Sequence, residues 1–185
     1  MYLKIFSSIL LASLVAACAT TSQPSAEELK LLDKPPAAVQ AKVAKFLPAA
    51  LAWYEQAERE LLPKGRQLTK AEQALARQLG VKRPEKVRVL ALETFPLPAD
   101  KTLRTEAERY GMGSKLEAGR TMGYAILLKT PYADNQQLLA HELVHVQQIE
   151  RMSSKAFVER YLLEMEMLGY ARSPLELEAY SKQNL

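Results

Sequence analysis

The sequence predicts a mostly helical α+β fold, and three observations carry this prediction. The chain has 185 residues, of which 48% are hydrophobic and 25% charged, which suits one globular core. Apolar residues recur at helical spacing over most of the chain, above all in its first half. Two short runs, 87–92 and 121–129, are rich in β-forming residues. We therefore expect one domain, residues 27–185, with a helical part (27–82) followed by a part (83–185) that contains a small sheet.

The chain begins with the layout of a secretory signal peptide over residues 1–17. Lys4 precedes an apolar run that is too short for a comfortable transmembrane helix. The run ends in LVAAC, which resembles the lipobox of bacterial lipoproteins, where cleavage leaves an acylated cysteine as the first residue. Residues 18–26 would then comprise the lipidated Cys18, the only cysteine, and a small, polar tether. We expect a mature chain that begins at acylated Cys18.

An acyl anchor would place the protein in the bacterial cell envelope, on the periplasmic side of a membrane. Ala19, in the place of an aspartate after the cysteine, resembles the signal for sorting to the outer membrane. The formal net charge is only +4 and no basic tract is present, so we expect no nucleic acid as a partner.

Helix signals divide the chain further. Residues 37–62 have helical periodicity, although Pro48 predicts a kink or a break. Thr69 and Glu72 form a capping-box pattern for a helix that reaches about residue 79. Asp134, with a glutamine three residues later, predicts the cap of a third helix, and Ser154 that of a buried helix over 155–168. Ser173, followed by a proline, predicts the start of a last helix.

Between these helices we expect two strands. The run 87–92 is bounded by Pro84 and Pro96, and Pro131 ends the run 121–129. Four of the seven glycines lie within or just before the second run, which indicates turns or close backbone approach there.

The chemistry of the chain is concentrated in HELVHVQQ, residues 141–148. His141 and His145 are the only histidines, and their spacing of one helical turn places both rings on one face, where they can share a metal ion. Glu142 completes the pattern H-E-x-x-H, in which two imidazoles bind zinc and the glutamate is the general base. The sequence therefore predicts a Zn²⁺ site with Glu142 as the catalytic group.

A catalytic zinc usually has a third protein ligand. No third histidine exists and Cys18 is expected to be acylated, so this ligand must be a carboxylate. The residues alone leave several choices open, which are Glu164, Glu166, Glu176 and Glu178.

The segment from Gly119 to Tyr180 resembles a gluzincin, the group of zinc peptidases in which the third ligand is a glutamate on a later helix. In several such families that glutamate stands three residues before an alanine, as Glu176 does before Ala179. The resemblance thus implies a zincin-like core, a small sheet packed on the H-E-x-x-H helix, with Glu176 as the third ligand.

Two alternatives to Glu176 stay open. If Glu176 is only the capping partner of Ser173, Glu178 would be the ligand. Glu164 has a spacing similar to that of thermolysin-like enzymes, but Leu168 stands where those enzymes have an aspartate.

Further roles are expected around this site. With both histidines used as ligands, the donor to an oxyanion must be a tyrosine, an arginine or a backbone N–H, and Tyr170 and Arg172 are the candidates. Many gluzincins have an aspartate that orients the first histidine at the position of Tyr180, whose hydroxyl could accept the imidazole N–H instead. The strand 121–129 could pair with an extended peptide.

Together these features predict a membrane-anchored zinc metallopeptidase that acts on a peptide or protein. The alternative is a lipoprotein adaptor or scaffold with a structural zinc site and no hydrolytic activity. Structural zinc sites are normally closed by four protein ligands, and the sequence supplies three, which favours the enzyme.

The anchor can be tested by detergent phase separation of the wild type and of Cys18→Ala. We expect the wild type in the detergent phase and Cys18→Ala in the aqueous phase, because the variant cannot carry acyl chains. Recovery of both proteins in the aqueous phase would show that the lipoprotein prediction is wrong.

Overall fold

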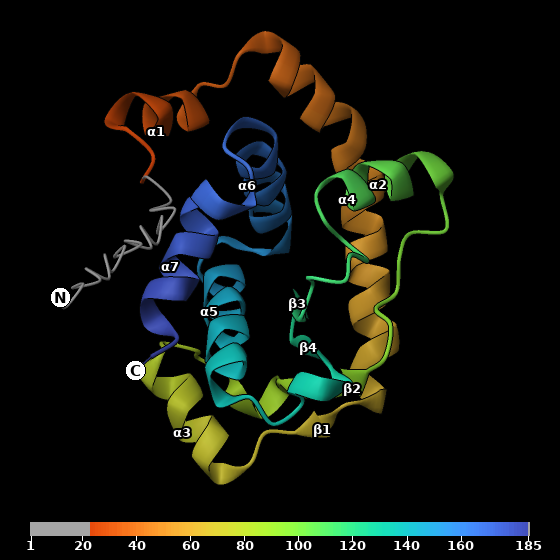
Figure 1. The fold of residues 1–185 in the computed structure, drawn as a ribbon, viewed down its shortest axis with the longest axis vertical. Helices are drawn as coiled ribbons and strands as arrows, with labels where there is room; N and C mark the ends of the chain where they lie inside the picture. Colours follow the sequence, from red (N-terminus) through yellow and green to blue (C-terminus); the bar gives the residue numbers. More distant parts are fainter. Residues whose placement is uncertain (1–22, 185) are drawn as a thin grey trace, which may run out of the picture.

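The computed structural model describes residues 23–184, which form seven α-helices and a four-stranded sheet (Figure 1). The predicted signal peptide and Cys18 lie outside these residues. Among the described helices, none is both long and apolar enough to cross a membrane. The helices are α1 (Ala26–Asp33), α2 (Ala37–Leu61), α3 (Lys70–Gln78), α4 (Lys101–Arg109), α5 (Gln136–Met152), α6 (Ser154–Met167) and α7 (Pro174–Lys182). The strands are β1 (Arg66–Gln67), β2 (Arg88–Leu92), β3 (Gly119–Met122) and β4 (Ala125–Lys129).

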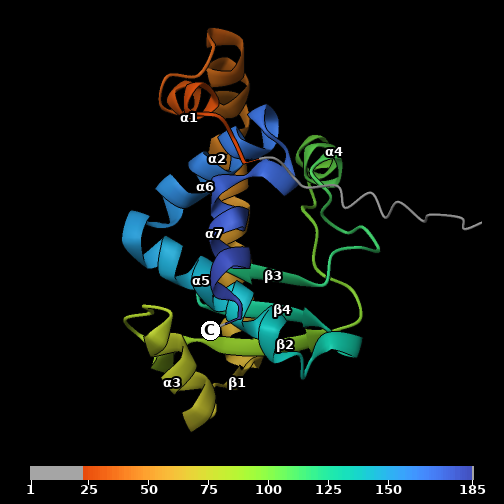
Figure 2. The ribbon, with the colours of Figure 1, turned by 60° about the vertical axis from the view of Figure 1, so that its left-hand side comes forward.

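The sheet is mixed and has the order β1-β2-β4-β3. Strands β2 and β4 are parallel, whereas β1 pairs with β2 and β3 with β4 in antiparallel fashion. Strand β3 is therefore an edge strand. Helices α3 and α5 pack against one face of the sheet and α2 against the other (Figure 2).

The expectation of a single strand over residues 121–129 is wrong, because the chain folds into the hairpin β3-β4 there. The turn lies at Gly123, whose φ of 62° is rarely adopted by other residues. Helix α2 holds this turn: Gly123 N donates to the Tyr54 hydroxyl (2.6 Å) and Tyr124 N to Glu58 (2.8 Å). A Cβ atom at position 123 would overlap the Glu58 carboxylate. The turn thus depends on a helix more than sixty residues away in the sequence.

Helix α2 does not break at Pro48, and runs as one element from Ala37 to Leu61. A proline inside a helix removes one backbone hydrogen bond. Burial of Ala50, Tyr54 and Ala57 on one side of this helix, within the core that α2 shares with α6, offsets that loss.

The helix caps agree with the sequence in two cases and differ in two. Thr69 caps α3 in a full capping box, and Ser173 caps α7. Helix α5 is capped by Asn135, whose side chain accepts from Leu138 N (3.0 Å), and not by Asp134. Helix α6 is capped by Ser153, one residue before the predicted cap. Asn and Asp are equally good caps, so the path of the preceding turn decides which one is used.

Candidate metal centre

Helix α5 places both histidines and the glutamate of the H-E-x-x-H pattern in the interior. It packs against β3 and β4 on one side and against α6 and α7 on the other. Only 4% of His141, 4% of Glu142 and 6% of His145 is exposed. Leu143 and Val144 are fully buried in the core beneath the sheet, which fixes the rotation of the helix about its axis.

Glu176 of α7 reaches this pair of histidines and forms a buried group with them that could hold a metal ion. His141 Nε2 lies 3.2 Å from both His145 Nε2 and Glu176 Oε2, and His145 Nε2 lies 3.6 Å from Glu176 Oε2. Ligands about 2.05 Å from a tetrahedral ion are separated by about 3.3 Å. The three atoms therefore fit one face of such a tetrahedron, with nitrogen and oxygen donors that suit a divalent transition metal.

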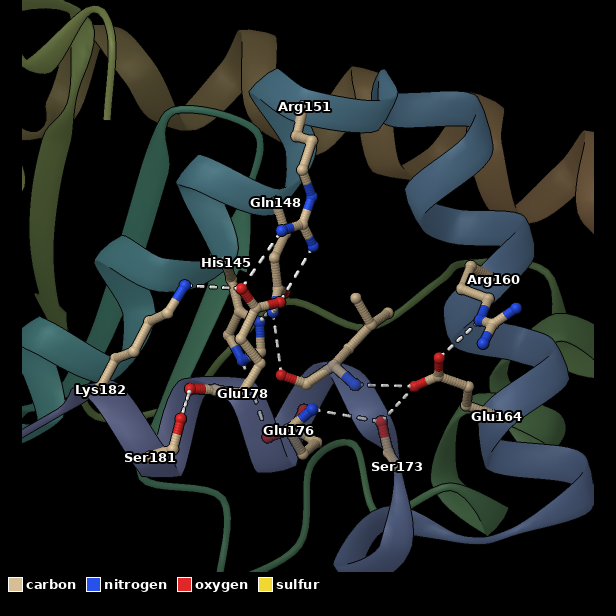
Figure 3. Close-up of polar contacts among 11 residues, drawn as sticks. His145, Gln148, Arg151, Arg160, Glu164, Ser173, Glu176, Glu178, Ser181 and Lys182 are labelled. Atoms are coloured by element: carbon tan, nitrogen blue, oxygen red, sulfur yellow. Dashed lines mark hydrogen bonds and ion pairs between the residues drawn. The ribbon is translucent and has the colours of Figure 1, made fainter. Parts of the chain in front are cut away.

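Gln148, on the next turn of α5, orients His145. Its Oε1 atom is 2.9 Å from His145 Nδ1, while its Nε2 donates to Leu175 O and to Glu178 (3.0 Å each; Figure 3). Because the amide oxygen can only accept, Nδ1 of His145 carries a proton, and Nε2 is the atom of this ring that would bind a metal ion. Gln148 belongs to HELVHVQQ, but its partners on α7 cannot be inferred from the sequence, and its role was therefore not predicted.

Glu178 supports Gln148 and is not part of the metal group. Its carboxylate also accepts from Arg151 (2.9 Å) and Lys182 (2.7 Å; Figure 3). Partial burial would raise its pKa, but these hydrogen bonds, with that from Gln148, lower the pKa to about 2. Glu178 of α7 is therefore negatively charged, and it links α7 to α5 through its contacts with Gln148 and Arg151.

Glu164 also lies outside the metal group, although only 1% of it is exposed. It accepts from Ser173 Oγ (2.6 Å) and Leu175 N (3.0 Å) at the start of α7 and pairs with Arg160 (2.6 Å; Figure 3). Of the glutamates considered from the sequence, Glu176 alone joins the histidines in the structure's metal group. Glu166, the remaining candidate, pairs instead with cations of α2 and α4.

Glu142 lies next to the metal group without belonging to it. Thr121 of β3 donates to its Oε2 atom (2.7 Å). A Cβ atom at Gly119 would stand 3.0 Å from the carboxylate carbon and still closer to Oε1, so only glycine leaves room there. Burial raises the pKa of Glu142, while the neighbouring histidines and Thr121 oppose this shift.

Of the two residues considered as donors to the oxyanion, one lines the cavity and the other does not. Tyr170 lines the cavity beside the metal group, and its hydroxyl lies 3.1 Å from that of Tyr180. Arg172 does not line this cavity and pairs with Glu28 of α1 (2.6 Å).

Tyr180 contacts His141 through its ring and not through its hydroxyl. The two ring centres are 4.7 Å apart and the rings meet edge to face. Among the described residues, His141 Nδ1 has no hydrogen-bond partner. The interpretation of Tyr180 as an acceptor is thus wrong, because one turn after Glu176 its side chain lies across the imidazole and its hydroxyl extends beyond it toward Tyr170.

Tyr161 of α6 lies at the metal group, although its sequence context does not predict it as a site residue. It lines the same cavity, and its hydroxyl interacts with Glu176. Burial and the negative charge of Glu176 raise its pKa well above the usual value, so the hydroxyl stays protonated. Nothing in the local sequence distinguishes Tyr161 from a packing residue, since only the return of α7 toward α6 brings it to the metal group.

A cavity of about 590 Å³ opens beside this centre. Its walls come from α2, α4, α5, α6, β3 and α7, and from the segment 110–118 between α4 and β3. Such a volume lies in the range of sites that hold small organic ligands.

No family model matches this chain, and comparisons with curated proteins and with solved structures also give no match. The geometry of the centre is therefore the basis for a functional interpretation.

The role of Glu176 can be tested by competitive chelator titration of single variants. Glu176→Ala should lower metal affinity by more than about 10-fold to 100-fold, because it removes a donor atom. Glu178→Ala is the matched control on the same helix and should cost less than about 10-fold, since Gln148 keeps its bond to Leu175. The reverse order of the two losses would contradict the assignment.

Proposed function

We propose that the protein is a zinc metallopeptidase anchored in the bacterial cell envelope. The observation that carries this proposal is the buried group of His141, His145 and Glu176 with a fourth, separate side chain, Glu142, beside it on a large cavity. Two histidines and one carboxylate are the ligand set of catalytic zinc in peptidases of the thermolysin type. We also propose that the core of the protein is zincin-like and that the peptidase is of the gluzincin type.

The donor set favours a site with an open position over a closed, structural one. Structural zinc sites usually have four protein ligands. Among the described residues, the group has three ligand residues, and they border a cavity. When bound, a zinc ion would acidify a water molecule and polarise the carbonyl of a substrate.

Glu142 is suited to proton transfer. Thr121 holds Oε2, so the carboxylate is fixed in direction while Oε1 lies above Gly119. From this position Glu142 takes a proton from the attacking water and hands it to the leaving amine.

Tyr161 is the better candidate for the oxyanion donor. It is a neutral phenol that lines the cavity at the metal group, whereas Arg172 is paired with Glu28 elsewhere. A preorganised hydroxyl of this kind stabilises the negative oxygen that forms when the peptide carbonyl is attacked.

The edge strand β3 offers the substrate a backbone to pair with. Lys129 N donates to Ala118 O (2.8 Å), so in this register the backbone groups of Arg120 and Met122 also face β4. Those of Gly119 and Thr121 then point to the open edge, on the side of the cavity. An extended peptide can add to such an edge as a further strand.

Substitution of Tyr161 by phenylalanine tests the oxyanion role. Tyr161→Phe should keep the metal content of the wild type, while kcat for a peptide falls by about 10²-fold to 10³-fold, because one donor to the transition state is lost. Tyr132→Phe, at an exposed position outside the cavity, is the control and should leave kcat unchanged. Wild-type kcat in Tyr161→Phe would assign the donor to another group.

The decisive variant is Glu142→Gln, which keeps the shape of the side chain and removes its basic oxygen. Zinc content should stay near one per chain, and hydrolysis of a peptide library should fall by about 10²-fold to 10⁴-fold. His141→Ala should lose both zinc and activity, whereas Glu159→Gln, at an exposed position on α6, should lose neither. Zinc loss in Glu142→Gln would make Glu142 structural, and a zinc-loaded wild type that cleaves nothing would favour the adaptor.

A further inference from the structure

The cavity continues past the metal group, over the edge of β3, to a wall formed by the long helix α2. This wall is apolar and consists of residues that share one face of the helix. They are Val43, Phe46, Ala50 and Trp53. Leu103 and Ala107 of α4 extend the wall, and Met122 of β3 joins it to the sheet. The N-terminal half of the chain thus reaches the candidate site.

The charged groups in this part of the cavity are paired with one another. Lys42 lies 3.4 Å from Glu106 and 3.0 Å from Glu166. Arg120 pairs with Glu117 (2.7 Å) and donates to the backbone oxygen of Pro96 (2.6 Å). These ion pairs balance the charges here, and Arg120 Nη2 is the one nitrogen of these side chains that is buried without a hydrogen-bond partner among the described residues. A charged group entering this space would lose its hydration and meet side chains whose charges are already balanced, so an uncharged, apolar group is favoured.

The register of β3 says which part of a peptide would meet the α2 wall. Side chains alternate between the faces of a strand. Thr121 contacts Glu142 on the α5 side, and Arg120 and Met122 therefore face α2. In a peptide paired with β3, alternate side chains would likewise point toward the metal group and toward Phe46 and Trp53.

We propose that the α2 wall is a specificity site that selects peptides with a large apolar side chain next to the bond that is cleaved. This inference rests on the proposed peptidase function, to which it adds the substrate class. Phe46 and Trp53 are the residues that determine the preference.

Trp53, the only tryptophan of the chain, reports directly on this wall. The wild-type protein is stripped of metal with a chelator and titrated with two pentapeptides whose termini are blocked. Each has two glycines on either side of the central residue, which is phenylalanine in one peptide and serine in the other. The phenylalanine peptide should change Trp53 fluorescence saturably. It should bind about 10-fold or more tightly than the serine peptide, as expected when a large apolar side chain is buried.

Two variants of α2 form a matched pair. Phe46 lines the cavity, whereas its neighbour Leu47 is partly buried but does not line it. Phe46→Ala should reduce the preference for the phenylalanine peptide to less than about 3-fold, and Leu47→Ala should retain it. Circular dichroism shows whether both variants keep their helices. If Phe46→Ala unfolds, Phe46→Leu is used in its place, and we expect it to lose a smaller part of the preference for the phenylalanine peptide.

Equal binding of the two peptides, or an equal effect of Phe46→Ala and Leu47→Ala, would overturn the proposal. So would tighter binding of a twelve-carbon fatty acid than of the phenylalanine peptide, which would indicate a site for acyl chains. Because these titrations need no metal and no turnover, they separate the two proposals. Cleavage of both peptides by the loaded wild type at equal kcat/KM would uphold the peptidase and refute the specificity site.

Discussion

The structure depends on one constraint, which is that three polar side chains from two helices, which together could hold a metal ion, meet in the interior. His141 and His145 come from α5 and Glu176 from α7, with the whole of α6 between them in the chain. Burial of three polar groups in one place is costly unless each is paired. The histidines therefore hold the pKa of the Glu176 carboxylate below its usual value, although burial acts in the opposite direction.

Two networks of hydrogen bonds hold α7 in the position that brings Glu176 to the histidines. Gln148 links α5 to the backbone and to Glu178 of α7, and Glu164 binds the first turn of α7 from α6. Both pairs of contacts act within one turn of Glu176, so a shift of α7 along its axis would break them together. Glu164 and Glu178, two of the glutamates considered as ligands from the sequence, thus help to place Glu176, which joins the metal group.

The sequence predicts the local features of this arrangement well, because they depend on neighbours in the chain. The capping box of Thr69 and Glu72, the start of α7 at Ser173 and the spacing of the two histidines are all of this kind. The hairpin at Gly123 and the continuity of α2 through Pro48 depend on packing between distant segments, and neither could be inferred locally. Gln148 and Tyr161 were missed for the same reason, since their partners are on other helices.

Different elements form the two parts of the cavity. The residues that could hold a metal are on α5 and α7, whereas the apolar wall is on α2 and α4. Strand β3 lies between them: Gly119 and Thr121 contact Glu142, and its hairpin turn is held by Tyr54 of α2. A change in the wall therefore leaves the ligand atoms in place, since no wall residue bonds to them in the described structure. A change at the turn would instead reach both sides, because the edge that would align a peptide is held by the helix that would select its side chain.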